Sequence, residues 1–304
     1  MRIGVTGASG FIGQALTQSL GERGDTVVRF VRPSTSRRTG PTIRWDPSHS
    51  FVDESDLRAV GRLDAMVNLA GVGIGDRRWN ARRKEEILSS RVQSTTLLAQ
   101  VVRTLSEGVG LVVSASAVGW YGDRGDEQLD ESSSGGVGFL AVVCRAWEGA
   151  TQPLVDAGIP VAHLRTGIVL SASGGALERQ LPMFRLGLGA TLGAGRQWMS
   201  PIALSDEIRA IEWVIDHQLS GPLNLVGPSP VTNFNFTRLL ASVLHRPSFL
   251  RLPKVALRAA LGREMADELL LTSQRVVPRR LLESGFAFVD PDAATALARE
   301  LSSV

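Results

Sequence analysis

Three glycines near the N-terminus constrain the fold of this chain more than any other feature. Gly7, Gly10 and Gly13 lie in TGASGFIG, directly after the strand-like run 2–6 and at the start of a helical pattern. The first glycine permits a tight turn, the second lets backbone amides approach a pyrophosphate, and the third lets helix and strand pack closely. The start of the helix also attracts negative charge. The spacing predicts a dinucleotide site, and the alternative is a tight turn without a ligand.

The rest of the first half alternates two kinds of segment. Strand-like runs occupy residues 2–6, 26–31, 42–45, 65–69, 110–114, 161–164 and 168–170, and helix-like runs occupy residues 11–23 and 81–105. Strands separated by helices indicate an α/β fold with a doubly wound parallel sheet, the Rossmann architecture. From about Ser171, glycine-rich loops and short helices replace this rhythm. We expect residues 1–170 to form the dinucleotide-binding domain, and residues 171–304 a smaller substrate lobe with a helical cap that does not fold independently.

The end of the second predicted strand indicates which dinucleotide is bound. An NAD site carries an acidic residue about 20 positions after the glycine turn, where it binds the ribose hydroxyls. Here the strand ends VVRFVRP, with Arg32 in that place and Arg37 and Arg38 just beyond. A guanidinium attracts a 2′-phosphate through charge-assisted hydrogen bonds. The sequence therefore favours NADP(H), and the alternative for Arg32 is a solvated charge at a strand end.

Other short segments are expected to border the cofactor. Asp46 in IRWDP could accept a hydrogen bond from the adenine amino group, and the small residues of NLAG follow the fourth strand. Asn68 of that motif could contact the cofactor or cap its strand. The expected cofactor residues are Gly7, Ser9, Gly10, Phe11, Ile12, Gly13, Arg32, Asp46, Leu69, Ala70, Gly71 and Ser114.

Taken together, TGASGFIG, NLAG and SASAVG resemble the extended short-chain dehydrogenase/reductase superfamily. The longer stretches YGDRGDEQLDE, GRQWMSPI and MADELLLTSQRVVPRRLLESGF are similar to its epimerase-family subgroup with a C-terminal cap. Members of that subgroup are described as nucleoside-diphosphate-sugar epimerases or cell-division-inhibitor-like proteins. The resemblance spans essentially the whole chain. It implies a Rossmann domain that binds NADP(H), and it implies little about the substrate.

The proton chemistry of this superfamily uses a Tyr-x-x-x-Lys pair, in which the lysine charge stabilises the phenolate near neutral pH. The only tyrosine of this chain, Tyr121, is followed four positions later by Gly125. If Glu148 is aligned with the acidic residue that follows the family lysine, Leu140 takes the tyrosine position and Cys144 the lysine position. Neither side chain can replace that pair, so the usual dyad is not encoded.

Two hydroxyls remain as catalytic candidates. Ser116 is the best match to the strand-end hydroxyl of the superfamily, with Ser114 as second choice, and could orient a carbonyl or hydroxyl beside the nicotinamide. Tyr121 could donate a proton as a neutral phenol, or pack beside Trp120 as a loop aromatic. Arg91 stands where many members carry asparagine, so the residue typical of their water-linked proton relay is also replaced.

Two later segments could reach a substrate. One is the charged loop that contains Asp123, Arg124, Asp126 and Glu127, for which plain solvation is the alternative. The other contains Arg196, Gln197 and Trp198, and Trp198 could instead belong to the core.

Composition and charge exclude several classes of function. The chain is 43% hydrophobic and 21% charged, as in globular proteins with a sizeable core. A net charge of +3, with arginines in short pairs, argues against nucleic acid. One cysteine and no apolar run of membrane-spanning length predict a cytoplasmic protein without disulfides or a membrane partner. The histidines lack metal-ligand spacing, and superfamily members often pair through outer helices, so a homodimer is an expectation by analogy.

Two functions are consistent with these observations. The first is an NADP(H)-dependent epimerase or oxidoreductase acting on a small hydroxyl or carbonyl substrate, unidentified but of the nucleotide-sugar kind by resemblance. The second is a non-catalytic NADP(H)-binding protein that reports the state of the cofactor to a partner. The missing dyad favours the second function, and the large C-terminal lobe favours the first.

Overall fold

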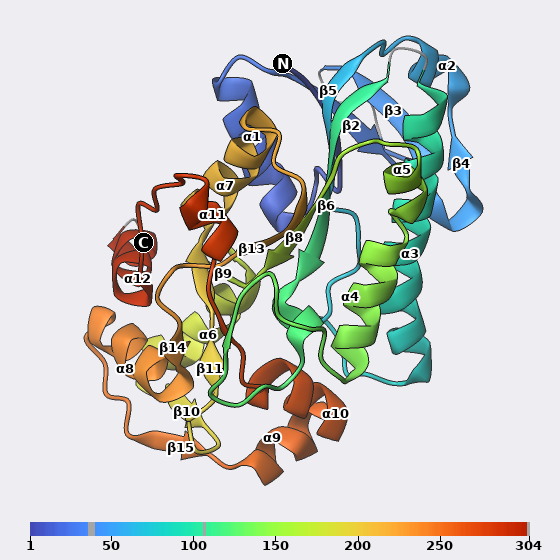
Figure 1. Ribbon diagram of the computed structural model, residues 1–304. Coiled ribbons are helices and arrows are strands. Elements are labelled where there is room, and N and C mark those ends of the chain that lie inside the picture. Colours follow the sequence, from blue (N-terminus) through green and yellow to red (C-terminus); the bar gives the residue numbers. More distant parts are fainter. Residues whose placement is uncertain (36–39, 106–107, 303–304) are drawn as a thin grey trace.

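The strands of the main sheet are β1 (Arg2–Thr6), β2 (Thr26–Val31), β3 (Thr42–Asp46), β4 (Phe51–Val52), β5 (Leu63–Asn68), β6 (Val109–Ala117), β8 (Val161–Thr166) and β13 (Gly221–Leu225). In the computed structural model, which describes residues 1–35, 40–105 and 108–302, they form one eight-stranded sheet in the order β13-β8-β6-β5-β1-β2-β3-β4 (Figure 1). All neighbours are parallel except β3 and β4. The doubly wound Rossmann architecture expected from the sequence is confirmed.

Helices cover both faces of this sheet, as its apolar central strands require. On one face lie α1 (Phe11–Glu22) and α7 (Leu204–Asp216), and on the other lie α3 (Ala81–Thr104), α4 (Phe139–Gly149) and α5 (Gln152–Asp156) (Figure 1). Leu16 and Ile211 are fully buried in the core of the first face, and Leu98 in that of the second. The carboxyl ends of the parallel strands therefore meet at one edge, where ligands bind in this architecture.

The sheet takes elements from both sides of residue 170. The strand β8 ends at Thr166, and after Gly167 the strand β9 (Ile168–Ser171) leaves the sheet to pair with β12 (Pro201–Ala203) instead of continuing the strand series as expected. The outermost parallel strand, β13, and the helix α7 that covers it come from the later part of the chain. The short run GPLNL gave little strand signal, because a glycine and a proline occupy its first two positions.

Most of the remaining later elements build a lobe beyond the carboxyl ends of the strands. They are α6 (Gly175–Arg185), β10 (Ala190–Leu192), β11 (Trp198–Met199), β14 (Val231–Thr232), α8 (Asn233–Val243), β15 (Leu250–Leu252), α9 (Lys254–Leu261), α10 (Arg263–Ala266), the π-helical turn η3 (Asp267–Leu271), β16 (Arg275–Val276) and α12 (Ala293–Ser302). The helix α11 (Arg279–Glu283) instead packs against β13, and its Leu281 lies in the core of the first sheet face. Phe184, Phe236 and Leu297 centre a separate core in this lobe. Three short elements lie in the first half, η1 (Pro47–His49), α2 (Glu54–Arg58) and η2 (Val118–Tyr121), and β7 (Gln128–Leu129) pairs with β16.

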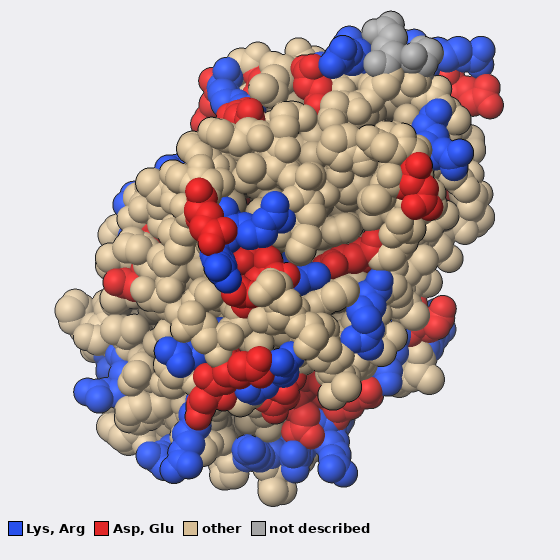
Figure 2. Space-filling model, viewed as in Figure 1, with Lys and Arg blue, Asp and Glu red and all other residues tan. Residues whose placement is uncertain are grey.

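No helix among the described residues is long and apolar enough to span a bilayer. On the face of the molecule drawn in Figure 2, acidic and basic side chains are interspersed and form no continuous basic stripe.

The carboxylate of Glu268 is one of the groups that join the lobe to the sheet domain. Glu268 of η3 accepts hydrogen bonds from the backbone N–H groups of Phe139, at 2.6 Å, and of Leu140, at 2.7 Å. These groups are the unpaired donors at the start of α4, where a negative charge is favourable. Close by, Lys84 of α3 pairs with Glu264 of α10 at 2.6 Å, but this ion pair is more exposed to water.

We expect Glu268→Ala to lower the free energy of unfolding by about 1–2 kcal/mol, because two helix-end N–H groups lose their acceptor. Urea unfolding followed by circular dichroism measures this loss. The matched control is Glu264→Ala, which removes an exposed ion pair and should cost at most about 1 kcal/mol. Equal costs for both variants would contradict the special role of Glu268.

Candidate functional site

The glycine turn after β1 has no room for a side chain at Gly7 or at Gly13. Gly7 has a φ of +65°, and a Cβ atom placed on it would lie 2.6 Å from the carbonyl carbon and oxygen of Leu69. A Cβ atom on Gly13 would overlap the carbonyl oxygen of Gly7. The turn is thus held between α1 and the segment that follows β5. The close packing of helix and strand predicted from the glycine spacing is confirmed.

Within the described part of the chain, no side chain caps the first turn of α1. Gly10 precedes the helix in an extended conformation, offers no side-chain cap, and no acidic residue lies in the first turn. Backbone N–H groups at a helix start carry a partial positive charge and form a ready site for a phosphate. Ser9 is exposed beside this helix start, and Ile12 packs against the core. Phe11 contacts the turn at Gly174 and is therefore partly covered by the lobe.

Arg32 follows β2 and is exposed. Within the described part of the chain, no hydrogen bond or ion pair engages its guanidinium; only its carbonyl is used, by the N–H of Thr35. Arg37 and Arg38 lie outside the described residues. Arg32 is therefore available to an anionic ligand at the end of β2.

Asp46 has local partners. Its carboxylate accepts hydrogen bonds from the hydroxyl and N–H of Ser48 and contacts Nδ1 of His49 at 2.8 Å. Chiefly through the hydrogen bond from the Ser48 hydroxyl, followed by that to His49, the pKa of Asp46 falls to about 2. The carboxylate caps η1, and this local role competes with the expected contact to adenine.

Asn68 is fully buried, and its amide is used inside the protein. Its Oδ1 accepts a hydrogen bond from the Thr6 hydroxyl at 2.7 Å, and its Nδ2 donates to the Thr95 hydroxyl at 2.9 Å. Of the two roles left open, the structure shows the internal one, which links β1, β5 and α3. The next residues, Leu69 to Gly71, are partly or fully exposed beside Gly7, as a cofactor border requires.

Ser116 takes part in a buried charged cluster. Its hydroxyl donates to Oε1 of Glu148 at 2.7 Å, and Arg165 of β8 binds both oxygens of that carboxylate, at 2.9 and 3.0 Å. The side chains of Arg165 and Glu148 are 5% and 9% exposed, so the pair is shielded from water. Arg165 was not predicted from the sequence, where its only signal is a charge within the apolar run VAHLRT.

Tyr121 extends the same cluster and is completely buried. Its hydroxyl donates to Oδ1 of Asn224 at 2.7 Å and accepts a hydrogen bond from Arg165 at 3.1 Å. Burial raises the pKa of this phenol above its ordinary value. The N–H of Asn224 in turn donates to Glu131 at 3.0 Å.

These contacts show the internal partners of the two catalytic candidates. Ser116 and Tyr121 both donate their hydroxyl hydrogen inside the protein in this arrangement, and their catalytic roles stay predictions. Ser114, the second choice, is also fully buried. For Tyr121 the structure favours the packing role that the sequence left open, because all its surface is enclosed by protein.

The two positions aligned with the missing dyad face η2. A Cβ atom on Gly119 would lie 3.2 Å from Cβ of Leu140 and 3.5 Å from Sγ of Cys144. Cys144 donates weakly to the carbonyl of Ala117 at 3.6 Å, and burial raises the pKa of its thiol to about 11. The α4 helix therefore packs directly on η2 at Leu140 and Cys144.

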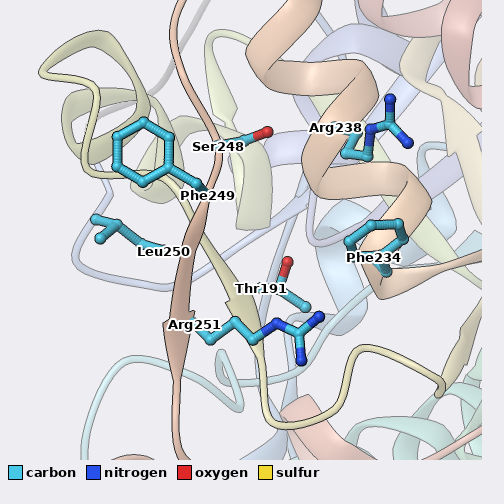
Figure 3. Close-up of a pocket in the computed structure, with 7 residues that line it drawn as sticks. All are labelled: Thr191, Phe234, Arg238, Ser248, Phe249, Leu250 and Arg251. Atoms are coloured by element: carbon cyan, nitrogen blue, oxygen red, sulfur yellow. The ribbon is translucent and has the colours of Figure 1, made fainter.

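Two adjoining cavities open in the lobe. The first, of about 410 Å³, is lined by Thr191, Phe234, Arg238, Ser248, Phe249, Leu250 and Arg251. The second, of about 500 Å³, is lined by Asp126, Ala194, Gly195, Arg196, Trp198, Thr232, Phe234, Asn235 and Arg251. Figure 3 shows Phe249 and Leu250 on one side of the first cavity, and Phe234 and Arg238 of α8 on the other.

The segments expected near a substrate contribute unequally to these cavities. Asp126 and Trp198 line the second cavity together and are joined by a hydrogen bond of 2.8 Å from Nε1 of the indole. Arg124 instead pairs with Glu127. Gln197 donates to two backbone carbonyls of the lobe and acts as a structural residue.

Glu207 of α7 is a buried carboxyl that the sequence analysis did not single out. Its Oε1 accepts a hydrogen bond from Thr166 at 2.9 Å, and its Oε2 has no partner among the described residues. Burial raises the pKa of Glu207 from 4.5 to about 8. The group is therefore protonated at neutral pH in the folded protein and ionised in the unfolded chain.

We expect this carboxyl to make stability depend on pH. At Glu207 the folded protein binds one more proton than the unfolded chain between pH 4.5 and about 8. The contribution of Glu207 to the free energy of unfolding therefore falls as pH rises through that window, by up to about 1.4 kcal/mol per pH unit. Glu207→Gln replaces the carboxyl with an amide that has nearly the same shape but does not titrate. Urea unfolding at pH 5 and pH 8 should show the variant gaining stability relative to the wild type at the higher pH; a constant difference would refute this assignment.

Comparisons with known proteins agree with the fold and the glycine turn. The NAD dependent epimerase/dehydratase family matches residues 3–139, and a domain of unknown function, DUF1731, matches residues 252–300. Epimerase family protein Mb2239 of Mycobacterium bovis is 46% identical over 94% of this chain and 93% of its own length.

Two solved structures extend the likeness over the whole chain. Human epimerase family protein SDR39U1 (isoform 2), crystallised with NADPH, has a TM-score of 0.88 at 33% identity, with all of both chains covered. The nucleoside-diphosphate sugar epimerase from Corynebacterium glutamicum has a TM-score of 0.78 at 36% identity, and the match covers all of this chain and 58% of that one. The chain therefore belongs to the NAD dependent epimerase/dehydratase family, within the extended short-chain dehydrogenase/reductases that carry a C-terminal DUF1731 domain.

Proposed function

We propose that this protein binds NADP(H) and acts as an oxidoreductase or epimerase on a small hydroxyl or carbonyl substrate. One observation carries the proposal: a glycine turn with no room for a Cβ atom at Gly7 or Gly13 leads into a helix whose start has no side-chain cap among the described residues. Such a helix start suits a pyrophosphate. The structure of the human relative crystallised with NADPH supports the same cofactor.

The residues present fit this cofactor. The turn from Gly7 to Gly13 would hold the pyrophosphate, and Arg32, whose guanidinium has no partner among the described residues, would hold the 2′-phosphate. The exposed edge from Leu69 to Gly71 would border the dinucleotide. When bound, the nicotinamide supplies hydride transfer, while the protein binds and orients the two reactants.

The residues that line the first lobe cavity favour a substrate that is anionic and contains a planar ring. Arg238 and Arg251 border the first cavity together with the rings of Phe234 and Phe249. Guanidinium groups bind phosphates, and aromatic faces stack on planar rings. A nucleotide-sugar-like substrate has both features, and the Corynebacterium relative bears the name of a nucleoside-diphosphate sugar epimerase. Because Ser116 and Tyr121 donate internally, we propose solvent as the proton source.

A second function has its own support. The dyad positions Leu140 and Cys144 are closed off by η2, and the protein has no tyrosine free to transfer a proton. These facts favour a non-catalytic protein that binds NADP(H) and reports the state of the cofactor to a partner.

Single-turnover absorbance at the nicotinamide band distinguishes the two functions. NADPH-loaded protein is mixed with a panel of keto sugars, nucleotide sugars, ketones and quinones, and NADP⁺-loaded protein with the matching alcohols. We expect at least one nucleotide-sugar-like compound to change the cofactor absorbance. Tight NADPH binding with no reaction across the panel would leave the sensor function as the better explanation.

Cofactor choice is tested by Arg32→Asp. We expect NADPH binding to weaken about 10- to 100-fold and NADH binding to improve relative to it, because a carboxylate repels the 2′-phosphate and accepts bonds from ribose hydroxyls. Titration calorimetry measures both affinities. Arg103→Asp, an equal charge change at an exposed position near the end of α3, is the control. Unchanged preference in Arg32→Asp would mean that this residue does not bind the 2′-phosphate.

A further inference from the structure

Arg91 of α3 is a cation without an acidic partner among the described residues. Its Nη1 donates to the backbone carbonyls of Val72, at 3.1 Å, and Ile87, at 3.0 Å. Burial lowers the pKa of its guanidinium to about 10, and the other titratable neighbours that act on it are Cys144 and Arg83, not a carboxylate. The group therefore remains positively charged at neutral pH.

The position of Arg91 connects the cofactor border with the site of the missing dyad. A Cβ atom on Gly71 would lie 3.3 Å from Cγ and 3.5 Å from Nη1 of Arg91, so the side chain lies along the exposed edge after β5. Its guanidinium carbon lies 4.9 Å from the ring centre of Trp147 on α4. Cys144 of α4, which is close enough to act on the charge of Arg91, takes the position of the dyad lysine in the sequence comparison with the superfamily.

The structure gives the charge of Arg91 too few partners to offset the cost of burying it. A partly buried cation without a counter-ion costs free energy, which two carbonyls and one aromatic face offset only in part. Holding the loop after β5 does not explain the charge, since Arg83 already donates to the carbonyl of Gly73 in the same loop. Nη2 and Nε of Arg91 have no acceptor among the described residues, which leaves two donors for a ligand.

We propose that Arg91 contacts the nicotinamide half of bound NADP(H) and supplies, from α3, a positive charge in place of the dyad lysine. The inference rests on the proposed function, because it needs a bound dinucleotide. The planar guanidinium can donate to two oxygens at once, such as the hydroxyls of the nicotinamide ribose. It stands beside Cys144 and along the Gly71 edge, so the positive charge of this site comes from a different helix than in members with the dyad.

The test compares two ligands that differ in the nicotinamide half. NADPH contains both halves of the cofactor, whereas 2′,5′-ADP contains the adenosine half with its phosphates. We expect Arg91→Met to weaken NADPH binding at least about 10-fold and to leave 2′,5′-ADP binding within about twofold, because one charge-assisted contact is lost only from NADPH. Arg91→Lys should recover part of the loss. Arg32→Asp should weaken both ligands, and Arg82→Met, which alters an exposed arginine of the same helix, should weaken neither.

Each outcome supports or overturns the contact between Arg91 and the nicotinamide half of the cofactor. Unchanged NADPH affinity in Arg91→Met would overturn the inference while leaving NADP(H) binding intact. A parallel loss of both ligands would show that Arg91 acts only through the loop, and would overturn it as well. If Arg91→Met does not fold, Arg91→Lys provides the same comparison, with NADPH weakened and 2′,5′-ADP unchanged as the supporting result. A wild-type protein that binds neither ligand would refute the proposed function and this inference with it.

Discussion

The close packing of the glycine turn against the backbone of Leu69 determines how α1, β1 and the segment after β5 are arranged at the candidate cofactor site. Gly13 lies so close to the carbonyl of Gly7 that α1 must begin directly above the end of β1, and Gly7 lies against the carbonyl of Leu69. The start of α1, the end of β1 and the segment after β5 therefore meet at one place. Because no side chain among the described residues caps α1, the positive end of the helix is left for a phosphate.

The α4 helix has a different role here from the one it has in dehydrogenases with a Tyr-x-x-x-Lys pair. Its start is capped by Glu268 from the lobe, its middle packs on η2 through Leu140 and Cys144, and its end holds Arg165 and Ser116 through Glu148. A helix with these contacts is a structural connection between sheet, loop and lobe. The proposed cation of the site is accordingly Arg91 of the neighbouring helix α3.

The geometry of the glycine turn was predictable from the sequence, and the contacts of the catalytic candidates were not. The roles of Gly7 and Gly13 follow from backbone geometry within a few residues, so a local pattern suffices to predict them. Tyr121, in contrast, is held by Asn224 and Arg165, which are 103 and 44 positions away along the chain. No local pattern announces such partners, and the sequence therefore left its roles as donor and packing residue open.

The sequence by itself determined the α/β class, the glycine turn, the arginine after the second strand and the absence of a tyrosine–lysine dyad, because each is a matter of residue type at short spacing. Only the tertiary structure decided that β13 joins the sheet and that Ser116 and Tyr121 donate internally. It also decided that Arg91 has no acidic partner among the described residues. These outcomes depend on contacts between distant segments, where burial and the pairing of charges, rather than local preference, determine which groups meet.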